Sequence, residues 1–185
     1  MSLSRTDILM LLLGAGSEGG FGREAIQGTT RLQKLLFLIE YEAGVTATEG
    51  KDFDFSAYKF GPVSKELYDD LEKLENLGFL EAKGVAEPSE SEASEYDLSF
   101  DDLMGEEEQE SRDTLEERRF KLTARGIEWL TTKVMPRVEQ NVFERIRKVK
   151  GKYGSFALSD LLYYVYTKYP DWTSASEIKD RVLGR

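Results

Sequence analysis

The sequence contains no cysteine and no histidine among its 185 residues. Without cysteine there are no disulfides, no thiol catalysis and no common structural zinc site. Without histidine the commonest general base and the Ser-His triad are missing. Walker loops, Gly-x-Gly-x-x-Gly fingerprints and EF-hand loops are also absent. The sequence therefore predicts no catalytic residue, no metal site and no cofactor, and we expect the protein not to be an enzyme.

Long hydrophobic runs are lacking as well. No run approaches the roughly 18 apolar residues that a membrane-spanning helix needs. The run from Ile8 to Leu13 is shorter than the roughly 7–15 residues of a signal-peptide core, and Asp7 stands where positive charge is usual. We therefore expect a cytoplasmic protein with no membrane partner.

Positive charge is outnumbered, since 35 acidic residues against 25 basic ones give a formal net charge of −10. The acidity is concentrated in residues 84–117, which hold 14 acidic residues and one basic residue, Arg112. The rest of the chain holds 24 basic and 21 acidic residues. Low hydrophobicity and like-charge repulsion predict a solvated, flexible insert over residues 84–117. A mildly basic remainder keeps nucleic-acid binding open.

Apolar residues recur at helical spacing in several segments. Ser4 is expected to cap the first helix, Thr29 or Thr30 the third, and Pro62 to lie in the first turn of the fourth. Ser174 and Glu177 form the pattern of a capping box for a last short helix. The expected helices cover residues 5–13, 23–28, 31–43, 62–77 and 155–169, with a long stripe over 127–149 that Pro136 should interrupt.

Two segments with alternating apolar residues, "FLEAK" (79–83) and "RRFKLT" (118–123), flank the acidic insert and predict a pair of strands. With their surroundings, "LENLGFLEAK" and "RRFKLTARGIEWL", they resemble the helix, wing and Leu-Thr-x-x-Gly exit of PadR- and MarR-type regulators. We expect a mainly α (α+β) fold. Residues 1–150 would form a winged-helix-like domain with a small β-wing, and residues 151–185 a C-terminal helical extension packed on it.

Another pair of segments, "LQKLLFL" (32–38) and "AYKFGPVSKELY" (57–68), resembles the Panacea (SocA-like) antitoxin domain and its YwgA-like relatives. Tyr58 stands where that family has Trp, and the matching core covers roughly residues 29–80. The resemblance implies a mostly helical scaffold that binds a toxin, a proteolytic partner or DNA and catalyses nothing. It implies structural roles for Leu32, Leu35, Tyr58, Gly61, Pro62, Val63 and Tyr68.

Three segments are candidate nucleic-acid contacts. The helix over 62–77 carries Glu66, Asp69, Asp70, Glu72 and Glu75 off its apolar stripe against Lys65 and Lys73, so phosphate groups would repel it. The helix that follows Thr29 is the better candidate, because recognition helices contact bases near their N-terminal ends. Its candidate residues are Thr30, Arg31, Gln33 and Lys34. The alternative is that Arg31 and Lys34 are ordinary exposed residues beside a core stripe.

The strongest positive region is residues 133–152, which hold seven basic and two acidic residues. It could bind phosphate, dock the acidic insert of its own chain or of a dimer mate, or form a solvated helix face with i,i+4 pairs. Its candidate residues are Lys133, Arg137, Arg145, Arg147, Lys148 and Lys150. The aromatic residues between Tyr153 and Trp172 could stack on single-stranded bases, but a core or subunit interface is favoured.

These patterns predict a non-catalytic regulatory protein that binds a macromolecule, either antitoxin-like or transcription-regulator-like. A protein partner, such as a toxin or regulatory protein, is favoured slightly over DNA because the helix over 62–77 and the insert are acidic. The main alternative is a winged-helix DNA-binding regulator whose acidic wing is autoinhibitory or mediates dimerisation. An enzyme of unknown type is the remaining alternative.

Overall fold

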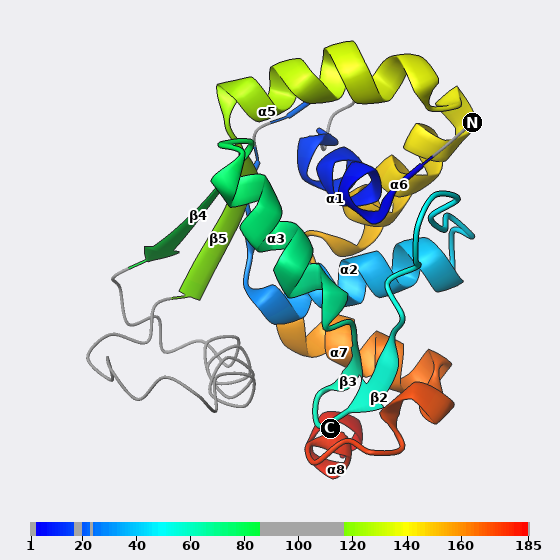
Figure 1. The fold of residues 1–185 in the computed structure, drawn as a ribbon. Helices are drawn as coiled ribbons and strands as arrows, with labels where there is room; N and C mark the ends of the chain where they lie inside the picture. The colour runs from blue at the N-terminus through cyan, green and yellow to red at the C-terminus, as the bar shows by residue number, and fades with distance from the viewer. Residues whose placement is uncertain (1–2, 17–19, 23, 86–116, 185) are drawn as a thin grey trace.

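The computed structural model describes residues 3–16, 20–22, 24–85 and 117–184 (Figure 1). Within these residues the chain is mainly helical with small antiparallel sheets. Most of the acidic insert lies outside the described residues. The prediction that this insert is flexible therefore also falls outside them. No helix in the described part is both long enough and apolar enough to cross a bilayer.

The elements follow one another in a mainly helical order, interrupted by two short hairpin-like strand pairs. They are α1 (Arg5–Gly14), β1 (Ile26–Gln27), α2 (Thr29–Tyr41), β2 (Ser56–Tyr58), β3 (Gly61–Val63), α3 (Glu66–Asn76), β4 (Leu80–Val85), β5 (Glu117–Leu122), α5 (Ala124–Trp129), η1 (Leu130–Val134), η2 (Met135–Arg137), α6 (Gln140–Tyr153), α7 (Leu158–Lys168), η3 (Pro170–Thr173) and α8 (Lys179–Leu183).

Helix α1 lies at the centre of the molecule. The expected cap at Ser4 is confirmed and forms a capping box with Asp7: the Ser4 hydroxyl accepts a hydrogen bond from the Asp7 N–H at 3.2 Å, and the Asp7 carboxylate accepts one from the Ser4 N–H at 2.9 Å. Every side chain from Ile8 to Leu13 is buried. A helix that is apolar on all sides must be surrounded by other elements, and Figure 1 shows α1 enclosed by helices of the rest of the chain.

The larger sheet has the order β1-β5-β4, with both pairings antiparallel. The predicted strands at 79–83 and 118–123 are therefore confirmed, with Phe120 opposite Ala82 in one pairing and Ile26 in the other. The helix expected over 23–28 is wrong, because Ile26 and Gln27 pair with β5 as an edge strand. Gly28 then turns the chain into α2 with φ of 85°, so it takes the N-cap position expected for Thr29 or Thr30.

The smaller sheet is the β2–β3 hairpin, in which Tyr58 pairs with Gly61. Pro62 lies in β3 and not in the first turn of a helix, which corrects the sequence-based expectation. The reason is that Gly61 adopts φ of 83° and closes the hairpin turn, and α3 begins only at Glu66. The ring of Tyr166 packs against Gly61, so this hairpin also contacts α7.

The C-terminal half begins as α5 and changes to a π-helical turn and a 3₁₀ turn before α6. The expected interruption at Pro136 is confirmed. Helix α6 runs unbroken to Tyr153, so the domain boundary expected at residue 150 falls inside a helix. Residues on both sides of that boundary contribute to one hydrophobic core. The last helix starts at Lys179 with Ile178 at its N-cap, so the capping box expected at Ser174 does not form.

Candidate functional site

Three of the four residues expected at the nucleic-acid end of α2 are buried. Thr30 and Lys34 are 1% exposed and Gln33 is fully buried. The Gln33 amide pairs with the main chain of Ser64: its oxygen accepts from the Ser64 N–H at 3.0 Å, and its nitrogen donates to the Ser64 carbonyl at 2.9 Å. The Lys34 ammonium donates to the Pro62 carbonyl at 3.0 Å. These side chains hold the β3 segment against α2 and cannot read a base edge.

This placement corrects both sequence-based interpretations of the segment, since each assumed that Lys34 is exposed. The fourth residue, Arg31, is half-buried, and its guanidinium donates to the carbonyl oxygens of Gly154 at 3.3 Å and Phe156 at 2.6 Å. It therefore binds the chain where α6 ends. Carbonyl groups in the last turn of a helix have no partner inside the helix, and a cation satisfies them while favouring the negative end of the dipole.

Lys150 has the same role at the end of α1. Its ammonium group donates to the carbonyl oxygens of Leu13 at 3.1 Å and Ala15 at 2.7 Å. The side chain is 8% exposed, and this burial lowers the pKa of Lys150 to about 8, against a smaller opposing effect of Glu24. Lys150 is thus not an exposed phosphate contact, as the sequence suggested, but a cation enclosed by the fold.

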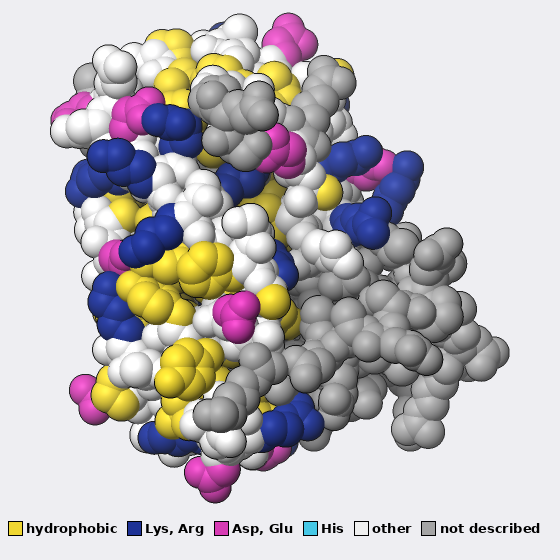
Figure 2. Space-filling model, turned by 180° about the vertical axis from the view of Figure 1, so that it is seen from behind, with side chains coloured by type: hydrophobic (Ala, Val, Ile, Leu, Met, Phe, Trp, Pro, Cys, Tyr) yellow, Lys and Arg dark blue, Asp and Glu magenta, His cyan; other side chains and the backbone are white. Residues whose placement is uncertain are grey.

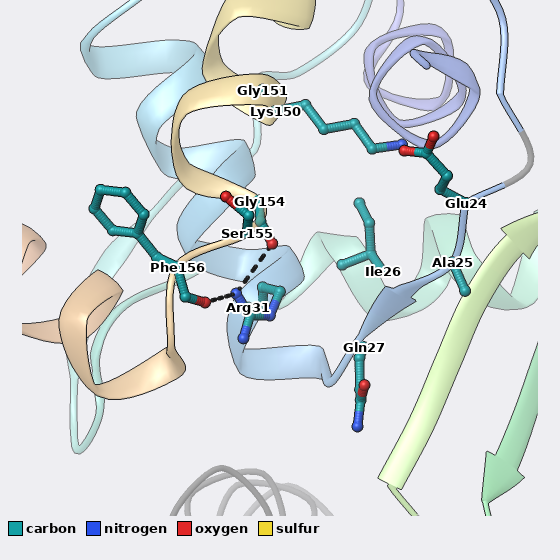
Figure 3. Close-up of a pocket in the computed structure, with 10 residues that line it drawn as sticks. All are labelled: Glu24, Ala25, Ile26, Gln27, Arg31, Lys150, Gly151, Gly154, Ser155 and Phe156. Atoms are coloured by element: carbon teal, nitrogen blue, oxygen red, sulfur yellow. Dashed lines mark hydrogen bonds between the residues drawn. The ribbon is translucent and has the colours of Figure 1, made fainter. Parts of the chain in front are cut away.

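The structure brings Arg31 and Lys150 to one cavity of about 320 Å³ between β1, α2 and the end of α6 (Figure 3). Figure 3 shows the Lys150 ammonium pointing toward the Glu24 carboxylate, away from the guanidinium of Arg31. The two cations are therefore neighbours that serve different helix ends. They do not form a joint phosphate clamp.

The other candidates from residues 133–152 are divided between internal contacts and solvent. Arg137 forms an ion pair with Asp7 at 2.7 Å, and Arg147 forms one with Glu144 at 2.6 Å within α6. Arg145 donates to the Ala43 carbonyl at 2.8 Å, beside the end of α2. Lys133 and Lys148 are exposed. The basic region is therefore not one continuous patch of free cations.

A network around Glu42, which the sequence did not predict, joins α2, α6 and α7. The hydroxyls of Tyr153 and Tyr164 donate to the two carboxylate oxygens at 2.6 and 2.8 Å, and Lys168 donates at 3.0 Å. Burial alone would raise the pKa of Glu42, but these hydrogen bonds outweigh it and lower the pKa to about 2. No sequence signal could have found this network, because Glu42 is more than 100 residues from its partners.

A shallow groove lies beside this network, along one side of α6, and is called the α6 groove below. Its volume is about 240 Å³. Three exposed cations from α6 border it, and the apolar parts of Val149, Ala43 and the Tyr153 ring contribute to its floor. The back face of the molecule, seen in Figure 2, shows Lys and Arg side chains bordering hydrophobic ones. The groove is lined by Glu42, Ala43, Arg145, Lys148, Val149, Lys152 and Tyr153.

The residues of the antitoxin-like motif lie in or beside the core. Leu32 and Leu35 are fully buried in α2, and Gly61, Pro62 and Val63 form the buried strand β3. Tyr58 and Tyr68 are half-buried and pack against the core.

Charged side chains of both signs remain exposed near the larger sheet. On α3 and its N-cap residue Lys65, the side chains of Asp69, Glu72, Glu75, Lys65 and Lys73 face solvent, whereas Asp70 is buried against Arg5 at 2.8 Å. On the strand pair, Lys83, Arg118 and Arg119 are exposed. In the sequence the two arginines were interpreted only as part of a strand, although their adjacency is a visible signal.

In the described residues no cluster of three or more His, Cys, Asp or Glu side chains could hold a metal ion. Among known proteins, no family model matches the chain, and no curated protein or solved structure shows significant similarity to it.

Proposed function

We propose that this chain is a non-catalytic regulatory protein, antitoxin-like or transcription-regulator-like, that acts by binding another macromolecule. A protein is the preferred partner, and the outer face of α3 is the proposed contact surface. The observation that carries the proposal is the charge of that face, on which three exposed acidic side chains outnumber two exposed lysines.

The scaffold supports this proposal through its order of elements. Three helices, α1, α2 and α3, precede the strand pair β4–β5, and β1 completes the sheet next to β5. We interpret this arrangement as a winged-helix-like domain in which β4 and β5 form the wing. The β2–β3 hairpin would then be an insertion before the third helix, and α6, α7 and α8 would be additional C-terminal helices.

The charge of α3 favours a protein over DNA. Asp69, Glu72 and Glu75 are exposed against Lys65 and Lys73, with Glu66 half-buried at the start of the helix. Double-stranded DNA carries one negative charge per about 1.7 Å of its axis, and non-specific affinity comes mainly from neutralising phosphates. An acidic helix face is therefore repelled by DNA and complementary to a basic protein surface.

A DNA-binding regulator is the second candidate, and the exposed cations of the strand pair favour it. Lys83 on β4 is exposed opposite Arg119 on β5, and Arg118, also exposed, lies on the other face of the strand pair. Glu81 offsets part of this charge through ion pairs with Lys83 at 2.5 Å and Lys121 at 3.3 Å. In this candidate the strand pair, and not α3, would contact the phosphate backbone, and the acidic insert would be autoinhibitory or would mediate dimerisation.

The experiment compares proteins that co-purify with the tagged full chain from its native host. The test variant is Glu72→Lys/Glu75→Lys on α3, and the matched control is Glu128→Lys/Glu139→Lys, which reverses two exposed acids elsewhere. We expect one partner recovered in stoichiometric amount by the wild type and the control, and lost by the α3 variant. An α3 variant that retains the partner would overturn the assignment of the surface.

Fluorescence anisotropy with random-sequence duplex DNA separates the two candidates. The protein-binding proposal expects no salt-dependent binding at near-physiological salt. If the duplex binds and Arg118→Glu/Arg119→Glu removes the binding, the second candidate is correct and the proposal of a protein partner is wrong.

A further inference from the structure

The α6 groove combines an apolar floor with a basic border. Arg145, Lys148 and Lys152 follow one another at positions i, i+3 and i+7 of α6, a spacing that places them on one side of a helix. All three are exposed, while Val149 and Tyr153, each next to one of these lysines in the chain, are buried to within a few per cent. A ligand that enters the groove therefore meets hydrocarbon below and positive charge at its edges.

Two of these cations are held in place. The Arg145 guanidinium is hydrogen-bonded to the Ala43 carbonyl at 2.8 Å. The Lys152 ammonium lies 4.6 Å from the centre of the Tyr153 ring and 3.5 Å from the Glu42 carboxylate. A preordered cation loses less conformational entropy when it pairs with an incoming anion. Among the described residues Lys148 takes part in no ion pair, and its ammonium is available at the edge of the groove.

Among the described residues, Glu42 is the one carboxylate that lines the groove, and its charge is already offset. Both of its oxygens accept hydrogen bonds from tyrosine hydroxyls, and Lys168 pairs with it at 3.0 Å. Three cations line the groove together with this carboxylate, and Lys168 pairs with the carboxylate from outside the groove, so the local charge is positive. The groove therefore attracts an anionic ligand even though the whole chain carries a net charge of −10.

We propose that the α6 groove binds an acidic peptide segment of a partner protein. One apolar side chain of the peptide would lie on Val149, Ala43 and the Tyr153 ring, and flanking carboxylates would pair with Lys148 and Lys152. The apolar floor favours a peptide over nucleic acid, because a phosphate backbone would leave that floor without an apolar contact. This surface is separate from α3 and opposite to it in charge, so the inference goes beyond the function proposed above.

The test is fluorescence polarisation with the full-length protein and a labelled nonapeptide of Asp and Glu around a central Leu. Three matched probes accompany it: the same peptide with a central Ser, the same peptide with Lys in place of every acid, and a single-stranded oligonucleotide. We expect the acidic Leu peptide to bind most tightly and its affinity to fall as salt rises. Tighter binding of the oligonucleotide would overturn the proposal.

Lys148→Glu is the test variant and Lys133→Glu the matched control, since both reverse one exposed lysine and Lys133 lies outside the groove. We expect Lys148→Glu to weaken peptide binding about tenfold, and Lys133→Glu to leave it unchanged. An equal effect of both variants would show that net charge alone attracts the peptide. The α3 variant Glu72→Lys/Glu75→Lys should bind the peptide as the wild type does, which separates this test from that of the proposed function.

The chain's own acidic segment is an alternative occupant that the same assay identifies. Residues 86–116 combine acidic residues with apolar ones such as Tyr96, Leu98 and Phe100. If the peptide binds only after deletion of residues 87–116, that segment occupies the groove and the proposal of an external partner is wrong. If the deletion leaves the affinity unchanged, an external partner is supported.

Discussion

The ammonium nitrogen of Lys150 lies 2.7 Å from the carbonyl oxygen of Ala15, at the residue that follows α1. It also donates to Leu13 in the last turn of that helix. A helix leaves its last carbonyl groups without partners, and here a side chain 135 residues away supplies the donor. A cation that looked like part of a phosphate-binding surface therefore joins α6 to the central helix.

Lys150→Met should change how stability depends on pH. The folded protein releases the Lys150 proton near pH 8, whereas the unfolded chain releases it near 10.5. Between these values the unfolded chain binds more protons at this group, so Lys150 makes the free energy of unfolding rise with pH, by up to about 3 kcal/mol. Urea unfolding of Lys150→Met should lack this rise, and Lys148→Met, at an exposed lysine, should retain it. If the free energy of unfolding changes with pH in the same way for all three proteins, the lowered pKa of Lys150 is contradicted.

Glu42→Gln should destabilise the protein by about 1–3 kcal/mol at neutral pH, because hydrogen bonds to a charged carboxylate are lost. The pKa of Glu42 is lowered from 4.5 to about 2 in the folded state. Its contribution to stability is therefore complete above pH 4.5 and is lost as pH falls toward 2. Chemical unfolding should show that wild type and variant differ less in free energy of unfolding at pH 3 than at pH 7. Glu139→Gln, at an exposed carboxylate, is the control and should change little at either pH.

Gln33→Leu should cost about 2–4 kcal/mol of unfolding free energy. The substitution removes both hydrogen bonds to the main chain of Ser64, which is itself buried, and leaves an N–H and a carbonyl group without their partners. The matched control is Gln140→Leu at an exposed position. Guanidinium unfolding with equal effects for the two variants would show that the Gln33 amide does not fasten β3 to α2.

Two glycines should respond in opposite ways to alanine. A side chain added to Gly151 meets no atom within 4 Å, so Gly151→Ala should stabilise α6 by about 0.5–1 kcal/mol. A side chain added to Gly126 would overlap the Phe79 carbonyl group, so Gly126→Ala should destabilise by about 1–3 kcal/mol. Thermal unfolding measures both. A higher melting temperature for Gly126→Ala would mean that α5 does not pack on Phe79 as the structure shows.

Local patterns were sufficient for the elements whose causes are local. The capping box at Ser4 and Asp7, the apolar spacing of α2 and the interruption at Pro136 are set by side chains within a few residues of the backbone they affect. The expectation failed at Ile26 and Pro62, where strand pairing decides. A two-residue strand is too short to show an alternation of apolar and polar residues. It forms because Ile26 and Gln27 pair with the edge of β5.

The candidate site was harder to predict because the identity of a basic residue does not reveal whether its side chain faces solvent or a main-chain carbonyl group. Arg31, Lys34 and Lys150 were selected for their charge, and each binds main-chain carbonyls. Conversely, nothing in the sequence connects Glu42 with Tyr153 and Tyr164. Their hydrogen bonds form only because α2, α6 and α7 pack together. Burial and long-range pairing are properties of the packed chain, and no local pattern encodes them.

The sequence by itself determined that this protein lacks cysteine and histidine chemistry, that it is rich in amphipathic helices and that its acidity is concentrated in one segment. Tertiary structure alone decided which charges remain available for binding. It enclosed Lys34 and Lys150, and it left α3 acidic on its outer face and α6 basic beside a groove. The physical reason is that helix ends and buried main-chain carbonyls need donors, and the cations nearest in space satisfy them whatever their distance along the chain.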